Sequence, residues 1–241
     1  PSGLNELVFT RKYENNQKLR ETYLKLWEMF EKKFINNPNI VFNLYNEPDY
    51  HSFKGTKGQS LWFAEVNKII KIIRDINPNR TVMVEGTNKS LFRRYGFDIM
   101  KKVNYANVIY GFHYYPYSGK RFQKKTSKIN RNKLETMNNK NSKLLMNYSI
   151  ENEMPVILSE VGGHSPFKNS KGEVIKGMLE DDYLFYIKSI KNNFFNKGIG
   201  ITWWATYDAF NTPYKRLPRT KKNINRGDVN FKDYIKVLIN N

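Results

Sequence analysis

Residues 36–48, NNPNIVFNLYNEP, decide the fold of this chain. Asparagine and proline at the start of this stretch stop a helix and make a turn, and the apolar residues 40–45 are typical of a short buried strand. The strand ends at polar residues, among them Glu47. Upstream, residues 14–34 carry large apolar side chains at a spacing of three or four, which predicts an amphipathic helix. The local order is therefore helix, turn, strand.

The same order of signals recurs four more times. Five strands that alternate with helices predict a parallel α/β architecture. A doubly wound nucleotide-binding fold is the main alternative, but no strand runs into a glycine-rich phosphate loop. We therefore predict a (β/α)8 barrel. The further helices are expected at about 60–76, 91–103, 130–150 and 181–195, the further strands at 81–86, 108–113, 155–160 and 198–204, and a last short helix at 232–239.

The number of strands falls short of a closed barrel. A (β/α)8 barrel needs eight strand–helix units, and this pattern supplies five. Because an open barrel fragment exposes two strand edges and an apolar interior, we expect the first three units in an upstream segment, another chain or a domain-swapped partner. The alternative is a shortened variant in which residues 7–10 form a strand. Residues 1–241 are interpreted as the C-terminal part of a single barrel domain.

Composition excludes several classes of protein. The 241 residues are 39% hydrophobic and 15% aromatic, which supports one large core and not a disordered chain. The absence of cysteine excludes a disulfide scaffold and a thiolate metal site. No apolar run is long enough to cross a bilayer. The three histidines show no ligand spacing, so neither a metal nor a cofactor is expected.

Two carboxylates at strand tips suggest a catalytic pair. Glu47 and Glu160 each end an apolar run, and the tips of parallel strands meet at one end of a barrel. Retaining hydrolysis of a glycosidic bond uses two carboxyl groups about 5–5.5 Å apart. Either residue alone would by default be a helix cap or a surface group. Neither has a helical partner that would explain it as part of a surface ion pair.

The motifs around these residues resemble glycoside hydrolase family 5 and its clan of barrel glycosidases. Residues 43–48, Asn-Leu-Tyr-Asn-Glu-Pro, resemble the signature that ends the fourth strand. Residues 112–115 (Phe-His-Tyr-Tyr), 158–162 (Leu-Ser-Glu-Val-Gly) and 202–204 (Thr-Trp-Trp) follow in the family's order. The resemblance extends from about residue 15 to the end and assigns the strands as the fourth to the eighth.

The resemblance implies a role for each matching residue. Glu47 would be the acid/base and Glu160 the nucleophile, while Asn46 would bind the sugar 2-hydroxyl. Tyr115 would hold Glu160 in its ionised, attacking orientation, and His113 would lie near the carboxyl pair. The platform under the sugar ring would be Trp204 or, alternatively, its neighbour Trp203, because adjacent residues of a strand point to opposite faces.

The chain also departs from the family pattern. Family members use an Arg on an early strand and a His after the third strand, and neither has a counterpart in this sequence. Both would belong to the missing units. Without that Arg the nucleophile lacks a positive neighbour that favours its ionised form, which leaves the activity of the chain alone open. Glu85 lies at the end of the strand expected at 81–86, which comes between the strands of Glu47 and Glu160 in the sequence. It is interpreted as a subsite or structural residue.

As a function, the resemblance implies a retaining β-glycosidase, in particular a cellulase-like endo-β-glucanase that acts on β-linked polysaccharide without a cofactor. It also favours a secreted location. β-1,4-Glucan, β-1,3-glucan, mannan and lipid-linked glycans all stay open as substrates, because loops and not catalytic motifs discriminate between them. The expected partners are the glycan and the missing barrel segment.

The net charge of +19 supports a second hypothesis. A non-catalytic, barrel-derived protein would bind an acidic partner or a glycan, and lysines and arginines cluster in residues 120–133 and 215–226. Nucleic acid is not expected as the partner, because no nucleic-acid motif accompanies the charge. The carboxyl pair discriminates between the hypotheses, since a binding module has no need of both Glu47 and Glu160.

Overall fold

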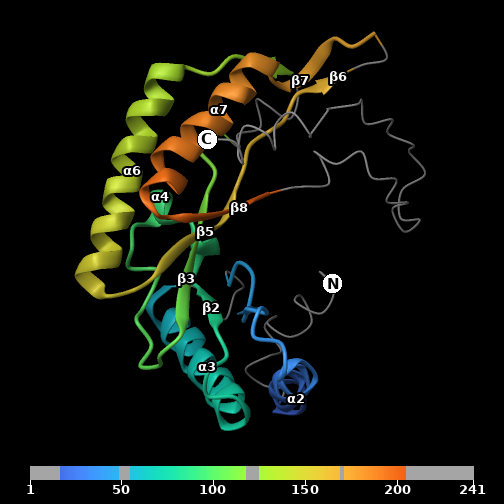
Figure 1. Ribbon diagram of the computed structural model, residues 1–241, viewed down its shortest axis with the longest axis vertical. Helices are drawn as coiled ribbons and strands as arrows, with labels where there is room; N and C mark the ends of the chain where they lie inside the picture. The colour runs from blue at the N-terminus through green and yellow to red at the C-terminus, as the bar shows by residue number, and fades with distance from the viewer. Residues whose placement is uncertain (1–16, 49–54, 118–124, 169–170, 205–241) are drawn as a thin grey trace. The chain divides into compact units, whose positions relative to one another are not determined.

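The computed structural model describes residues 17–48, 55–117, 125–168 and 171–204. The chain forms two compact units, one of residues 1–113 and 147–157, the other of residues 114–146 and 158–241. The chain passes between the units along two strands and one helix, each of which begins in one unit and ends in the other. Each unit is described by itself (Figure 1).

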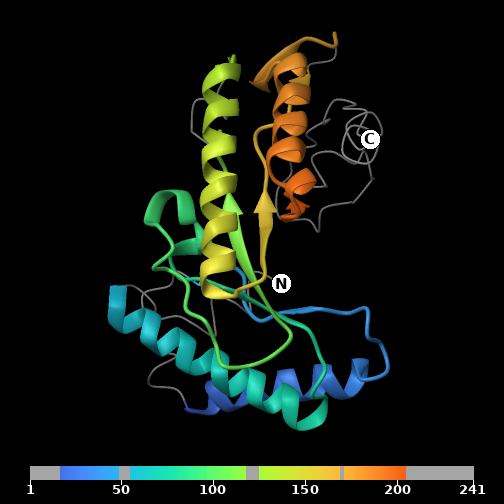
Figure 2. The ribbon, with the colours of Figure 1, turned by 60° about the vertical axis from the view of Figure 1, so that its left-hand side comes forward.

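The first unit is a parallel sheet with two long helices. β1 pairs with β2 and β2 with β3, in both cases parallel, and the next strand beside β3 is β5. The two helices α2 and α3 pack against each other (Figure 2). The bounds are α2 Gln17–Phe34, β1 Phe42–Asn43, α3 Gly55–Ile76, β2 Val82–Glu85, β3 Val108–Tyr114 and β5 Val156–Val161.

Helix α3 supplies much of the core of this unit. Its buried residues recur at a spacing of three or four, as the sequence predicts for a helix with one face toward a sheet. On β2, Val82 and Val84 are fully buried, and so is Phe112 on β3. The fully buried side chains of α3 are Trp62, Val66, Ile69, Ile70 and Ile73. This packing fixes the strand ends, where the candidate site lies.

A buried ion pair connects α2 to the start of β2. Arg80 Nε lies 2.8 Å from Glu31 Oε2, and both side chains are almost completely buried. The guanidinium also donates to the backbone carbonyls of Phe34, at 2.6 Å, and Ile40, at 2.9 Å. Because those carbonyls belong to the end of α2 and the turn that follows it, Arg80 holds the chain that leads into β1.

The predicted helix over residues 91–103 is much shorter than expected. A 3-10 helix, η2, covers Asn88–Ser90, and a single turn, α4, covers Phe92–Tyr95. The turn ends at Gly96, whose φ of 76° is a left-handed value that glycine adopts without strain. Phe97 then stacks on Tyr148, with ring centroids 4.3 Å apart. The apolar residues beyond Gly96 therefore pack from a loop and not from a helix.

The second unit contains the end of β5, which is followed in the sheet by β8. A small separate sheet has the order β4-β7-β6, in which β4 and β7 are parallel and β6 and β7 are antiparallel. The sequence analysis did not predict this sheet. The bounds are β4 Thr126–Ser127, α6 Arg131–Asn152, β6 Phe167–Lys168, β7 Val174–Met178, α7 Glu180–Asn193, η3 Phe195–Lys197 and β8 Gly200–Trp203.

Helices α6 and α7 lie side by side (Figure 2) and meet through polar side chains. Asn138 on α6 accepts a hydrogen bond from the Tyr114 hydroxyl, at 2.7 Å, and donates one to Ser189 on α7, at 2.8 Å. Glu135 accepts from Ser189 and from Asn193. All of these polar groups have partners, so the contact carries no cost of unsatisfied burial.

The helix–strand order confirms the predicted parallel α/β architecture. Apart from the shortened segment after β2, each predicted helix and strand that lies within the described residues is present near its expected bounds. The predicted helix over 232–239 and the candidate strand over 7–10 lie outside the described residues. Within the part of the chain that the structure describes, no helix has both the length and the apolar character needed to span a membrane.

Candidate active site

Three polar side chains meet at the ends of parallel strands in the first unit. Glu85 is the last residue of β2, His113 lies near the end of β3, and Glu47 follows β1 after three residues. The carboxyl ends of parallel strands lie at the same edge of a sheet, which is where α/β folds build their sites. The contacts among these side chains show how the edge is organised.

Glu85 is the buried centre of this group. Its Oε1 accepts a hydrogen bond from Asn43 Nδ2 at 3.0 Å, and its Oε2 accepts one from the backbone N–H of Glu47 at 2.9 Å. Its backbone carbonyl accepts from the indole N–H of Trp62 at 2.8 Å. The residue is fully buried. Glu85 thus links the core of the unit to the backbone of Glu47.

Glu47 presents its carboxylate from a left-handed backbone conformation, with a φ of 53°. Such a value is uncommon for a residue other than glycine, asparagine or aspartate, and occurs at turns and functional sites. Oε1 lies 3.3 Å from His113 Nδ1, and Oε2 lies 3.7 Å from Lys89 Nζ. The side chain is 31% exposed, so it is held by neighbours but open to solvent.

The pKa of the Glu47 carboxyl is lowered in this environment. Burial raises it, but the hydrogen bond and charge of His113, together with the charge of Lys89, outweigh burial and bring the pKa below its usual value. The charge contribution of His113 requires an imidazolium ion, whereas the hydrogen bond requires only a hydrogen on Nδ1.

His113 is completely buried between two carboxylates. Its Nδ1 faces Glu47, and its Nε2 lies 3.1 Å from Glu85 Oε2. The contact of Nδ1 with Glu47 has hydrogen-bond geometry, whereas Nε2 approaches Glu85 as a close charge contact without that geometry. The sequence placed His113 near the acid/base candidate, and the structure brings the two together within the first unit.

In the second unit, Glu160 lies on β5 and accepts a hydrogen bond from the Tyr115 hydroxyl. The distance from Tyr115 Oη to Glu160 Oε2 is 2.6 Å, which is typical of a hydroxyl bonded to a carboxylate. Both side chains are half-buried. The hydrogen bond from Tyr115 orients Oε2 of the Glu160 carboxylate.

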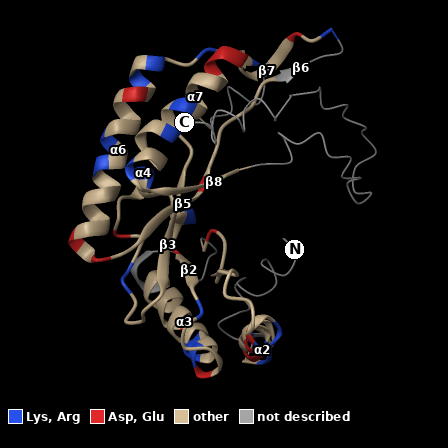
Figure 3. Ribbon diagram, viewed as in Figure 1, with Lys and Arg blue, Asp and Glu red and all other residues tan. Residues whose placement is uncertain are grey.

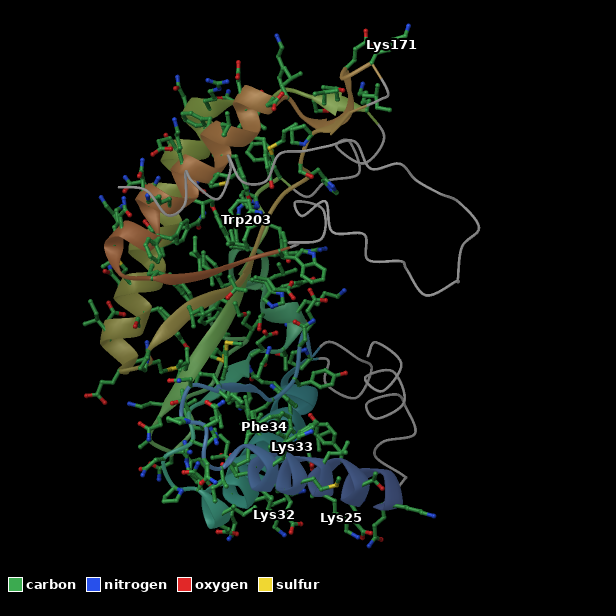
Figure 4. All side chains as sticks on the ribbon, turned by 45° about the vertical axis from the view of Figure 1, so that its right-hand side comes forward. Lys25, Lys32, Lys33, Phe34, Lys171 and Trp203 are labelled. Atoms are coloured by element: carbon green, nitrogen blue, oxygen red, sulfur yellow. The ribbon has the colours of Figure 1, made fainter. Side chains whose placement is uncertain are left out.

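The two tryptophans at the end of β8 have different environments. Trp203, labelled in Figure 4, packs edge-on against the rings of Tyr183 and Tyr186, and its indole nitrogen lies 3.3 Å from the Tyr183 hydroxyl. Trp204 is 49% exposed. Its backbone N–H donates to the carbonyl of Val161 at 2.8 Å. Of the two candidates for a sugar platform, Trp204 is therefore the more exposed.

Glycine is required beside this tryptophan. A Cβ added at Gly162 would lie 1.9 Å from the carbonyl oxygen of Trp204, which is far inside contact distance. The carbonyl of Gly162 accepts a hydrogen bond from Tyr186 at 2.7 Å. The glycine of the Glu-Val-Gly motif at the end of β5 thus has a packing reason in addition to its position two residues after Glu160.

Sequence reasoning identified some of these residues and missed others. Asn46 is exposed next to Glu47, as a sugar-binding side chain would be. Lys89 was missed because it lies in an irregular segment in which residues 88–90 all have positive φ. No sequence pattern predicts such a segment. Asn43 was missed because nothing in the sequence distinguishes it from an ordinary strand residue.

The described charges are spread over the surface. Figure 3 shows Lys and Arg on several helices, α2 and α6 among them, with Asp and Glu between them. Several of the lysines pair with acidic neighbours, as Lys71 does with Asp75 and Lys102 with Glu153. Residues 120–124 of the first basic cluster found in the sequence, and the whole of the second cluster at residues 215–226, lie outside the described residues.

Comparisons with known proteins identify the family and the fold of the chain. A model of the cellulase family, glycosyl hydrolase family 5, matches residues 5–209. A comparison with curated protein sequences found no match. Among solved structures, an endoglucanase is similar over 81% of this chain with 22% identity and a TM-score of 0.62. This chain spans 61% of the length of that endoglucanase.

Two further structures have the same fold. Subunit Z of the clostridial cellulose synthase from Clostridioides difficile is 19% identical over 91% of this chain and 68% of its own, with a TM-score of 0.67. Cel5A of Thermotoga maritima, solved in complex with a mannotriose substrate, is 14% identical over 96% and 70%, with a TM-score of 0.67. These likenesses confirm the predicted barrel type of α/β fold.

Proposed function

Because the chain belongs to the cellulase family, glycoside hydrolase family 5, we propose that it is a retaining β-glycosidase that cleaves β-linked polysaccharide internally, as an endo-β-glucanase. The proposed reaction is a double displacement in which Glu47 is the acid/base and Glu160 the nucleophile. It needs no cofactor.

In the first step a carboxylate oxygen of Glu160 attacks the anomeric carbon. The bond from that carbon to the glycosidic oxygen breaks, and the leaving oxygen takes the proton of Glu47. In the second step Glu47, now a carboxylate, removes a proton from water. The water oxygen displaces Glu160 from the anomeric carbon, and the two inversions together retain the configuration.

One observation supports the joint role of the two carboxylates. Glu47 contacts His113, and Glu160 contacts Tyr115, two residues further along the chain. Neighbouring residues of an extended segment are about 3.3 Å apart along the chain. The partners of the two carboxylates therefore come from the same short stretch of sequence, residues 113–115.

The exposed groups and the similar structures support a proposal for the substrate class. Trp204 is a half-exposed aromatic residue of the kind on which sugars stack, and exposed Asn46 offers an amide beside Glu47. One similar structure is described as an endo-β-1,4-glucanase in complex with substrate, and another as a complex with mannotriose. We propose β-1,4-glucan as the substrate, with mannan as the first alternative.

The test is the release of reducing sugar from glucan, mannan and xylan by the unaltered protein and by Glu160→Gln and Glu47→Gln. Glu153→Gln, which changes an exposed surface pair, is the matched charge control. We expect turnover that is lost in Glu160→Gln, is strongly reduced in Glu47→Gln and is unchanged in the control. Proton NMR of the first product should show retained anomeric configuration. Unchanged turnover in Glu160→Gln, or inversion, would refute the proposal.

A binding role without catalysis is an outcome of the same experiment. In that case the unaltered protein would bind the polysaccharide but release no reducing sugar, and neither carboxylate variant would differ from it. Affinity electrophoresis in gels that contain each polysaccharide separates this outcome from the absence of any interaction.

A further inference from the structure

We infer that Glu85 is a positioning residue for the acid/base, which keeps a proton on His113 Nε2 so that the exchangeable proton lies between His113 Nδ1 and Glu47. This inference rests on the proposed function for the role of Glu47. Its structural part concerns only residues of the first unit.

Three donors surround the Glu85 carboxylate. The amide of Asn43 bonds to one oxygen, the backbone N–H of Glu47 bonds to the other, and His113 Nε2 lies 3.1 Å from that second oxygen. An ionised carboxylate only accepts hydrogen bonds, whereas a glutamine of the same shape has one accepting and one donating end. With the Asn43 amide oriented as it is in the structure, with Nδ2 toward Glu85, glutamine in either orientation would place a donor against a donor. The surroundings therefore select a carboxylate.

The carboxylate determines which nitrogen of His113 carries hydrogen. An acceptor beside Nε2 favours the tautomer with hydrogen on Nε2, which leaves Nδ1 toward Glu47 Oε1 at 3.3 Å. A neutral His113 can then accept a proton at Nδ1 from Glu47, and an imidazolium can return it. The opposite tautomer would place a hydrogen on Nδ1, so that His113 could donate to Glu47 but could not take a proton from it at that nitrogen.

Glu85 also holds the backbone of Glu47. The φ of 53° at Glu47 is a conformation that the residue adopts only when its surroundings impose it. The bond from its N–H to buried Glu85 supplies such a constraint. Lys89, whose Nζ lies 3.7 Å from Glu47 Oε2, is the charged neighbour on the other side of the carboxylate.

The kinetic test compares substrates that differ in their need for acid catalysis. The variant is Glu85→Gln, and Glu65→Gln is the control, because Glu65 is a nearly buried carboxylate of the same unit that pairs with Lys68. With cellotetraose, kcat/KM of Glu85→Gln should fall about 10- to 100-fold, the effect of a lost orienting partner. With a dinitrophenyl cellobioside, whose leaving group needs no proton, kcat/KM should change less than about threefold. An equal loss on both substrates would overturn the inference.

A spectroscopic test is independent of turnover. Nitrogen-15 NMR of the imidazole, with signals assigned by a His113→Gln variant, reports which ring nitrogen carries hydrogen. We expect the Nε2–H tautomer in the unaltered protein and in Glu65→Gln, and a measurable share of the Nδ1–H tautomer in Glu85→Gln. An unchanged tautomer would overturn the inference.

These two tests separate the inference from the proposed function. If the unaltered protein cleaves no glycan, the proposed function fails, and the NMR experiment still decides what Glu85 does to His113. If Glu85→Gln does not fold, Glu85→Asp takes its place, since it keeps the charge but shortens the reach to the three donors. It should show the same substrate dependence with a smaller loss, and a wild-type profile would count against the inference.

Discussion

The Tyr115 hydroxyl donates a hydrogen bond of 2.6 Å to Oε2 of Glu160. This bond orients one of the two oxygens of the proposed nucleophile. A hydrogen bond to a charged group contributes about 1.5–3 kcal/mol. Replacement of Tyr115 by phenylalanine removes the bond but keeps the ring.

We therefore expect Tyr115→Phe to lower kcat/KM by about 10- to 150-fold, the range that corresponds to the loss of such a bond. The melting temperature should change little, because the aromatic ring and its half-buried position are retained. Steady-state kinetics with a soluble cello-oligosaccharide and a thermal melt provide the two readouts. A normal kcat/KM in this variant would show that Tyr115 does not orient the nucleophile.

Lys89 provides a test of the charge around Glu47. Burial raises the pKa of the Glu47 carboxyl, while His113 and Lys89 lower it further than burial raises it. Replacement of Lys89 by methionine removes a positive charge 3.7 Å from Oε2, so the carboxylate loses a stabilising neighbour and the pKa of Glu47 rises.

In the proposed mechanism the alkaline limb of the pH profile of kcat/KM reports loss of the Glu47 proton. In Lys89→Met this limb should move to higher pH, and the shift should be small because the side chains are partly exposed and the interaction is screened. The difference in the position of this limb between the unaltered protein and the variant should diminish as the salt concentration is raised. Arg93→Met is a charge-matched control from the same segment. A limb that moves to lower pH would contradict the assignment.

The sequence predicted the strand ends better than their surroundings. Glu47, His113 and Glu160 could be proposed as site residues because each follows or ends a run of strand-forming residues. Such a run is visible in the sequence itself. The role of Glu85 was left between subsite and structure, because its partners Asn43 and His113 come from neighbouring strands and their contacts depend on register. That information is tertiary, and no local pattern contains it.

Irregular segments explain the other differences. The helix expected after β2 stops at Gly96, and the apolar spacing beyond it serves loop packing onto Tyr148. The small sheet escaped prediction because β4 and β6 have only two residues each. A pair of residues is too short to show the alternation by which strands are recognised.

The buried ion pair of the first unit gives a stability prediction. Glu31→Gln would leave Arg80 with an unpaired charge in a nearly closed environment, although three backbone carbonyls still accept from it. Breaking one partner of a buried pair typically costs about 3–5 kcal/mol. We expect Glu31→Gln to lower the free energy of unfolding by about that amount in urea titrations.

The surface pair of Lys102 and Glu153 is the control for this experiment, since both side chains are at least half exposed. Glu153→Gln should leave the urea midpoint nearly unchanged, because exposed ion pairs are screened by solvent. If Glu31→Gln were as mild as Glu153→Gln, Arg80 would be satisfied by the backbone carbonyls alone. The connection from α2 to β1 would then not depend on the ion pair.

The two tryptophans of β8 offer a last, paired prediction. Trp204 is 49% exposed, whereas Trp203 packs on Tyr183 and Tyr186. If Trp204 is the sugar platform, Trp204→Ala should raise KM for oligosaccharides and leave the melting temperature nearly unchanged. Trp203→Ala should instead destabilise the protein by more than about 2 kcal/mol, since removal of a packed aromatic ring leaves a cavity.

Trp204→Phe separates stacking from size, because a smaller aromatic ring still offers a face to the sugar. It should recover much of the affinity that Trp204→Ala loses. The affinity is measured by isothermal titration calorimetry with a cello-oligosaccharide, in the Glu160→Gln background. The reverse result, in which Trp203→Ala weakens sugar binding without loss of stability, would move the platform to Trp203. In that case Trp204 would be an exposed residue without a role in binding, and the sugar would have to reach the face of β8 that Tyr183 and Tyr186 now cover.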